Sequence, residues 1–182
     1  AKEINIPVLA AWVDKGYDIV TPIPSCTLMY KQELPLMFPD DEAVRKVQAA
    51  MYDPFEYLML RHKDGKLKTD FAQSLGKVSY QVPCHLRVQN IGLKTRDVLQ
   101  LVPDTSVEVI ERCSGHDGTY AVKKEFHDIS KKIARPVVNK VKKSGADHFV
   151  SDCPMASDQI AQDLDDYSAG HPMSLLRKAY GI

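Results

Sequence analysis

The sequence predicts an α/β fold made of two small units, each with a mostly parallel sheet. Three observations lead to this prediction: strand and helix patterns alternate, a polar stretch divides the chain, and one order of segments occurs twice. The polar stretch, residues 62–69, contains a glycine and is the best candidate for a boundary. We therefore expect an incomplete first unit over residues 1–69 and a complete second unit over residues 70–182.

The first unit alternates between helical and extended patterns. Apolar residues at helical spacing predict its first helix, and Gly16 is placed to end it. A short buried strand follows, and Pro22 and Pro24 break it around Cys26. The expected elements are a helix over 5–15, a strand over 17–21, and helices over 41–50 and 54–60.

The second unit is more regular. Its apolar periodicity predicts strands over 78–82, 106–110 and 148–151, and helices over 92–101, 122–133, 157–164 and 172–179. Pro136 is expected to kink the helix that starts at residue 122 or to start a new one over 137–143, which Gly145 would end. Strands that alternate with helices indicate a parallel sheet covered on both faces.

One order of segments occurs in both units. A helix, a glycine, an aspartate two residues later, a strand and a Pro/Cys turn follow one another around Gly16, and the same order occurs around Gly145. This similarity indicates a duplicated unit, although chance likeness between two αβ units is the alternative.

Composition excludes several classes of protein. The 182 residues carry 24 Lys and Arg against 24 Asp and Glu, so there is no basic excess to neutralise nucleic-acid phosphates. The apolar runs are too short to span a bilayer. The start shows no secretory signal, but it is Ala1 rather than Met, so an upstream targeting segment would not be visible.

Four cysteines, Cys26, Cys84, Cys113 and Cys153, each follow a predicted strand closely. Parallel strands end at the same edge of a sheet, so three thiols of the second unit are expected to meet there. Thiolates are soft ligands for zinc, copper(I) or iron–sulfur clusters. The alternative is that each cysteine is a small buried apolar residue. The polar, Gly- and Pro-rich turns around these cysteines favour a metal site.

These turns also resemble a known family. Pro83-Cys-His-Leu, then Cys113-Ser-Gly-His-Asp-Gly-Thr-Tyr, then Asp152-Cys-Pro-Met are similar to the motifs of the cysteine-rich CCG domain. This domain occurs in heterodisulfide reductase and in the iron–sulfur subunit of anaerobic glycerol-3-phosphate dehydrogenase. The resemblance implies that residues 1–69 are the C-terminal part of a first such domain and residues 70–182 a complete second one.

The resemblance implies an iron–sulfur cofactor. The family pattern has five cysteines, and Cys84, Cys113 and Cys153 match three of them, whereas Ser114 and Ala156 stand where the other two would be. A [4Fe–4S] cluster with a fourth ligand from elsewhere, or a single metal ion, fits this set better than the family's unusual five-thiol cluster. Gly115 lies in a turn that can aim backbone N–H groups at cluster sulfurs.

Three residues are candidates for the fourth ligand. A tight turn at Gly115 would bring His116 back toward Cys113, and the alternative is that His116 is a surface loop histidine. His85 directly follows Cys84, and adjacent residues seldom reach one metal. Cys26 belongs to the first unit and reaches the site only if the two units face each other.

We therefore predict an electron-transfer subunit or domain of an oxidoreductase complex, rather than a stand-alone catalyst. The resemblance implies a dehydrogenase or ferredoxin-like redox partner and a cytoplasmic location, either free or peripheral at the inner face of the membrane. The alternatives are a zinc-binding structural domain, with three cysteines and one further ligand, and a metal-free interaction scaffold.

Overall fold

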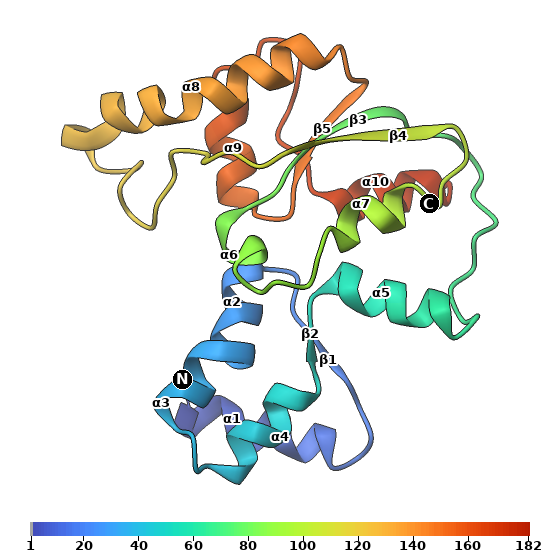
Figure 1. The fold of residues 1–182 in the computed structure, drawn as a ribbon, viewed down its shortest axis with the longest axis vertical. Helices are drawn as coiled ribbons and strands as arrows, with labels where there is room; N and C mark the ends of the chain where they lie inside the picture. The colour runs from blue at the N-terminus through green and yellow to red at the C-terminus, as the bar shows by residue number, and fades with distance from the viewer. Residues whose placement is uncertain (1) are drawn as a thin grey trace.

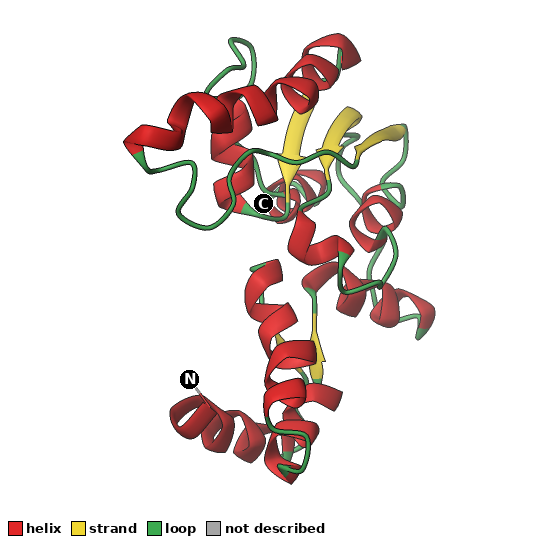
Figure 2. Ribbon diagram, turned by 60° about the vertical axis from the view of Figure 1, so that its left-hand side comes forward, coloured by secondary structure: helices red, strands yellow, loops and turns green. Residues whose placement is uncertain are grey.

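The computed structural model describes residues 2–182, which form two regions joined near the middle of the molecule (Figure 1). The smaller region contains the start of the chain and two short strands, and the larger region contains a three-stranded sheet with helices around it (Figure 2). Every strand pair is parallel. The predicted α/β fold class is confirmed, whereas the duplication of the unit stays a prediction.

The smaller region is mostly helical. Strands β1 and β2 pair through Ile19 with Met51 and Val20 with Tyr52. Its buried core lies between α1, α4 and the helical stretch that follows β1. The elements up to the boundary are α1 (Lys2–Val13), β1 (Ile19–Val20), α2 (Pro24–Leu28), a π-helical segment (Met29–Glu33), α3 (Leu34–Met37), α4 (Glu42–Ala49), β2 (Met51–Tyr52) and α5 (Pro54–Lys63).

The larger region has the strand order β4-β3-β5, with β3 in the centre. The register pairs Gln81, the last residue of β3, with Ile110 of β4 and Ser151 of β5. The elements are β3 (Gly76–Gln81), α6 (Cys84–Arg87), α7 (Lys94–Leu99), β4 (Thr105–Ile110), a 3₁₀ segment (Lys124–Phe126), α8 (His127–Ser144), β5 (His148–Ser151), α9 (Pro154–Ala161) and α10 (Pro172–Ala179).

Both faces of this sheet are covered, as the sequence predicts. Val78 and Tyr80 belong to a core that also contains residues of α5, α7 and α10. On the other face, Ile110 and Phe149 share a second core with α8 and α9. This double coverage explains why the central strand is buried along most of its length.

Helix α5 precedes the expected boundary but packs into the core of the larger sheet. Asp53 caps the helix and Glu56 completes a capping box, while Pro54 occupies the first turn. Phe55 is fully buried among the residues of the core formed by β3, α7 and α10. The chain then runs from Asp64 to β3 without a further helix or strand.

Two expectations about helices are wrong in detail. Helix α8 runs through Pro136 without a break and starts at His127, not at residue 122. Pro136 is exposed, so the carbonyl that loses its N–H partner can be solvated. Helix α9 starts at Pro154 rather than at residue 157, because proline fits the first turn of a helix.

Candidate metal centre

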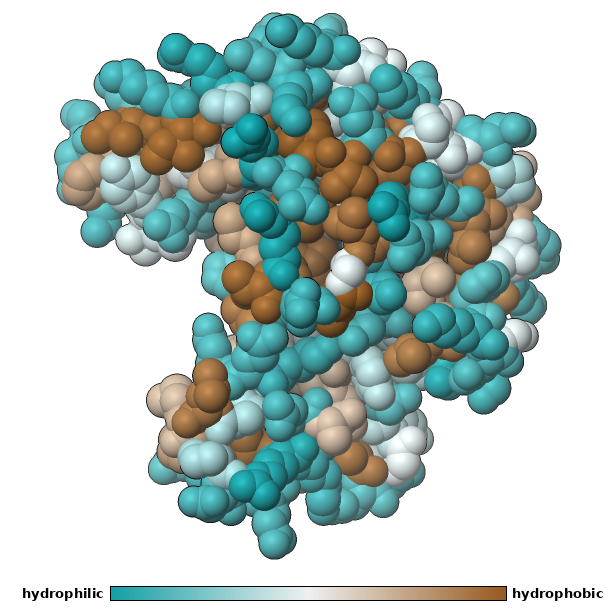
Figure 3. All heavy atoms as spheres, viewed as in Figure 1, coloured by the Kyte–Doolittle hydropathy of each residue, from teal (hydrophilic) through white to brown (hydrophobic). Residues whose placement is uncertain are grey.

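The ends of the three parallel strands meet at one edge of the larger sheet. There, Cys84, Cys113 and Cys153 line a single cavity of about 570 Å³. The cavity lies on the concave side of the molecule, between α6, the loop before α8, the start of α9 and the start of α2 (Figures 1 and 3). All four cysteines are free thiols, and Cys84 and Cys113 are exposed. The fold thus brings together thiols that lie far apart in the sequence.

Cys84 is the first residue of the short helix α6, which starts after Pro83. Burial raises the pKa of its thiol, and the neighbouring thiol of Cys113 raises it further. A raised pKa favours the protonated thiol, so metal binding at Cys84 must displace a proton.

The turn after Cys113 depends on Gly115. The Gly115 N–H donates a hydrogen bond to the sulfur of Cys113, at a donor–acceptor distance of 3.4 Å. Gly115 has φ of 78°, and a Cβ built there would lie 2.3 Å from the carbonyl oxygen of Ser130. The hydroxyl of Ser130 in turn donates to the Gly115 carbonyl at 2.6 Å. Only glycine therefore lets this turn pack against α8.

Cys153 follows a buried polar cluster. The carboxylate of Asp152, which is 2% exposed, accepts hydrogen bonds from Tyr80 Oη at 2.5 Å and Thr95 Oγ1 at 2.9 Å. The Nε2 atom of His171 donates to the Asp152 carbonyl oxygen at 3.1 Å. Burial raises the pKa of Asp152 to about 6, although the two hydroxyl donors lower it. These bonds fix the backbone immediately before Cys153.

Residues 78–160 match the family model of the cysteine-rich CCG domain. This stretch of the chain is similar to a CCG domain. A subunit of anaerobic glycerol-3-phosphate dehydrogenase, the one designated C, is 29% identical over 168 residues in each of Escherichia coli strains K12 and O157:H7. An uncharacterized iron–sulfur protein of Methanococcus maripaludis is 28% identical over 98 residues.

The lengths of these relatives differ from that of this chain. The two E. coli alignments cover 91% of this chain but 41% of each relative. The M. maripaludis alignment covers 52% of this chain and 19% of the relative. The chain therefore spans less than half the length of the curated relatives that it matches.

Both positions at which the matched stretch departs from the pattern of the resemblance line the cavity. Ser114 is 8% exposed and Ala156 is 5% exposed, and each lies beside a cysteine turn. A hydroxyl and a methyl group thus occupy the places where the resemblance would put the second paired thiol and the last thiol.

The candidate fourth ligands are placed differently. His116 and His85 line the cavity together with Gly115, whereas Cys26 is exposed and is not among the lining residues. Pro24 and Ser25, which directly precede Cys26, do line it, so the smaller region closes one side of the cavity. Within residues 2–182, no three His, Cys, Asp or Glu side chains lie close enough together to hold a single metal ion.

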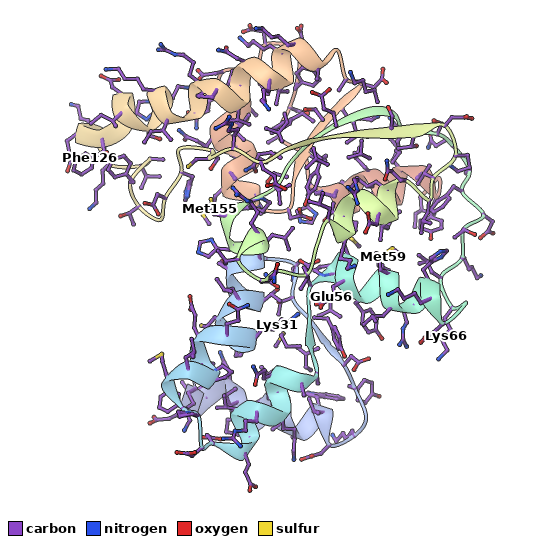
Figure 4. All side chains as sticks on the ribbon, in the orientation of Figure 1. Lys31, Glu56, Met59, Lys66, Phe126 and Met155 are labelled. Atoms are coloured by element: carbon purple, nitrogen blue, oxygen red, sulfur yellow. The ribbon has the colours of Figure 1, made fainter. Side chains whose placement is uncertain are left out.

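Several lining and supporting residues were not identified from the sequence. Met155 projects toward the concave side (Figure 4) and lines the cavity. The buried cluster of Tyr80, Thr95 and Asp152 also escaped prediction, because isolated polar residues in strands and helices have no periodic pattern. The Asp-Cys-Pro order around Cys153 was the available signal for Asp152.

Proposed function

We propose that this chain is an iron–sulfur electron-transfer subunit, or a domain of one, in an oxidoreductase complex. The observation that carries the proposal is the convergence of three free thiols, from three parallel strand ends, on one cavity. The CCG match and the similarity to a glycerol-3-phosphate dehydrogenase subunit and to an iron–sulfur protein support it.

Cys84, Cys113 and Cys153 would hold the cluster, and His116 is the best placed fourth ligand because it lines the same cavity. These residues suit an iron–sulfur cluster, since thiolates are its usual ligands and none of these thiols forms a disulfide. A bound [4Fe–4S] cluster would supply one-electron transfer. The protein's own contribution is to shield the centre and to present the Gly115 N–H to the Cys113 sulfur, both of which tune reduction potential.

The partner would be a dehydrogenase subunit or a ferredoxin-like module that exchanges electrons with this centre. The cavity opens on the concave side, where a partner can approach the thiols closely. None of the helices within residues 2–182 is long and apolar enough to cross a bilayer. The complex would lie in the cytoplasm, either free or peripheral at the inner face of the membrane.

Metal analysis of protein purified and reconstituted without oxygen tests the proposal. We expect iron and acid-labile sulfide in near-equal amounts, broad visible absorbance, and an electron paramagnetic resonance signal after reduction. A colourless protein with one zinc per chain would instead support a structural zinc site held by three cysteines and His116. A protein that takes up neither metal would contradict both assignments.

A further inference from the structure

Gln81 is a buried polar residue at the centre of the cysteine-bearing edge. It is the last residue of β3, the middle strand, and only 1% of its surface is exposed. Burial of a side-chain amide is costly unless its donors and acceptor are bonded. All of the hydrogen-bond partners of this amide lie at strand ends that lead to a cysteine.

The amide of Gln81 bonds to each of the three cysteine turns. Its Nε2 atom donates to the carbonyl oxygens of Val82 and Arg112, each at 2.9 Å. Its Oε1 atom accepts from the hydroxyl of Ser151 at 2.7 Å. Val82 lies two residues before Cys84, Arg112 directly precedes Cys113, and Ser151 lies two residues before Cys153.

The third connection extends to the cysteine itself. The Ser151 hydroxyl oxygen accepts the backbone N–H of Cys153 at 3.4 Å. A chain of hydrogen bonds therefore runs from the Arg112 carbonyl through the Gln81 amide and the Ser151 hydroxyl to Cys153. It links the turns at the point where the strands end.

We propose that Gln81 is a positioning residue that ties together the three cysteine turns around the proposed metal centre. Glutamine suits this position because one planar group supplies two donors and an acceptor. Glutamate would turn an oxygen toward the two carbonyls, and an apolar side chain would leave both carbonyls without this donor. Gln81 is not among the residues that line the cavity.

Gln89 provides a matched control. It is also buried, at 6% exposure, and its Nε2 atom also donates to two backbone carbonyls, those of Pro24 and His85, each at 3.1 Å. Gln89 links the Cys84 turn, at His85, to the Cys26 turn, at Pro24, and it bonds to neither the Cys113 turn nor the Cys153 turn. A loss of metal affinity that is specific to Gln81 therefore separates positioning from general loss of buried hydrogen bonds.

The first measurement is Cd²⁺ binding to the metal-free full chain. The ultraviolet charge-transfer absorbance of the Cd²⁺–thiolate bonds monitors this binding. We expect Gln81→Met to weaken Cd²⁺ binding by about 10-fold or more, the range typical of residues that orient metal ligands. Gln89→Met should change it by less than about threefold on the same scale. The thermal midpoint of each variant is measured alongside.

The second measurement needs no metal. In a Cys26→Ala/Cys153→Ala background, dibromobimane becomes fluorescent only when the thiolates of Cys84 and Cys113 displace both of its bromides. Cys84 and Cys113 line the same cavity, so this background should cross-link readily. Gln81→Met should slow the second, intramolecular displacement, because the Val82 and Arg112 carbonyls are no longer held by one amide.

Ser151→Ala provides a second variant if Gln81→Met does not fold. It removes only the hydrogen bonds that connect Gln81 to Cys153, so Cd²⁺ affinity should fall while cross-linking between Cys84 and Cys113 stays unchanged. Unchanged Cd²⁺ affinity in folded Gln81→Met or Ser151→Ala protein would overturn the inference, as would a failure of the Gln81-containing background to cross-link.

The inference rests on the proposed metal site, but the two can fail separately. If the unmodified chain binds neither Cd²⁺ nor iron, the proposed function is wrong, while the cross-linking rates still decide the role of Gln81. If the unmodified chain binds both and Gln81→Met binds them equally well, only the positioning role is wrong.

Discussion

The two sheets of the molecule end near the same cavity but differ in their chemistry. The larger sheet has three adjacent strand ends with a cysteine after each, and these cysteines line the cavity. The smaller sheet has two strand ends, and its one cysteine, Cys26, lies outside that lining. The comparison shows that a cysteine after a strand is not enough: adjacent strand ends and polar side chains that connect them bring thiols together.

The largest expected contrast is between Cys113→Ala and Cys26→Ala. Removing Cys113 should abolish most iron incorporation, because its thiol lines the cavity together with Cys84 and accepts the Gly115 N–H. Cys26→Ala should retain the iron. Iron analysis after reconstitution without oxygen measures both. Equal iron loss in the two variants would place Cys26 at the centre.

The pH dependence of unfolding free energy extends the comparison to Asp53, which lies where the smaller and larger regions meet. Burial raises the pKa of Asp53 to about 7, with the nearby Asp152 carboxylate adding to the shift. Since the folded state holds this proton more tightly than the unfolded state, the contribution of Asp53 to stability is greatest below pH ~4 and falls as pH rises toward 7. Asp53→Asn keeps the capping oxygen and should remove this loss, which amounts to as much as about 4 kcal/mol.

Asp41 caps α4 in the smaller region and provides the control for the Asp53 titration. The hydrogen bond from Lys2 is the main cause of the lowered pKa of this carboxyl. Its contribution is therefore present above its unfolded pKa and lost as pH falls, opposite in sign to that of Asp53. Urea unfolding of wild type, Asp53→Asn and Asp41→Asn at several pH values measures both slopes. Parallel profiles for wild type and Asp53→Asn would contradict the assignment.

Two glycines with positive φ, one in each region, allow the stability cost of a Gly→Ala substitution to be compared. Gly115→Ala should cost about 3 kcal/mol, because it adds a left-handed strain and a clash with the Ser130 carbonyl. Gly16 also has positive φ, of 85°, but no atom lies within 4 Å of a Cβ placed there, so Gly16→Ala should cost only about 1 kcal/mol. Urea midpoints give both values, and equal losses would show that space at Gly115 is unimportant.

The smallest contrast concerns two lysine ion pairs. Lys31 contacts Glu56 of α5 at 2.6 Å in a half-buried position between the regions (Figure 4), whereas Lys46 contacts Asp14 on the surface. Lys31→Met should cost about 1 kcal/mol and Lys46→Met less than about 0.5 kcal/mol, since exposed pairs are screened by solvent. Thermal unfolding at low and high salt distinguishes them, and a larger loss for Lys46→Met would reverse this ranking.

Much of the larger sheet was predictable because its strands and helices have strong apolar periodicity. The placement of Cys84, Cys113 and Cys153 followed from that prediction, since parallel strands end at one edge. The resemblance to the CCG domain, carried by the same turns, was confirmed by the family match. The roles of these thiols as metal ligands stay a prediction.

Other features depend on contacts between distant residues and so leave no local pattern. The bonds of Gln81 reach both neighbouring strands, and those of Asp152 reach Tyr80 and Thr95. Helix bounds shifted for local reasons: Pro154 starts α9 earlier than its apolar positions indicate, and exposed Pro136 is accommodated inside α8. Periodicity predicts where helices form, but it did not identify the buried face of α8, where Ile129 and Ile133 are exposed, and it does not show which polar atoms meet.

The position of α5 limits how the larger sheet can be excised. Phe55 fills a place in its apolar core, so a fragment that starts at residue 70 would leave a hole there large enough to destabilise it by several kcal/mol, on the order of 3–5 for a missing phenylalanine. A shortened protein meant for spectroscopy should therefore begin before Asp53, so that the helix keeps its cap and its anchor.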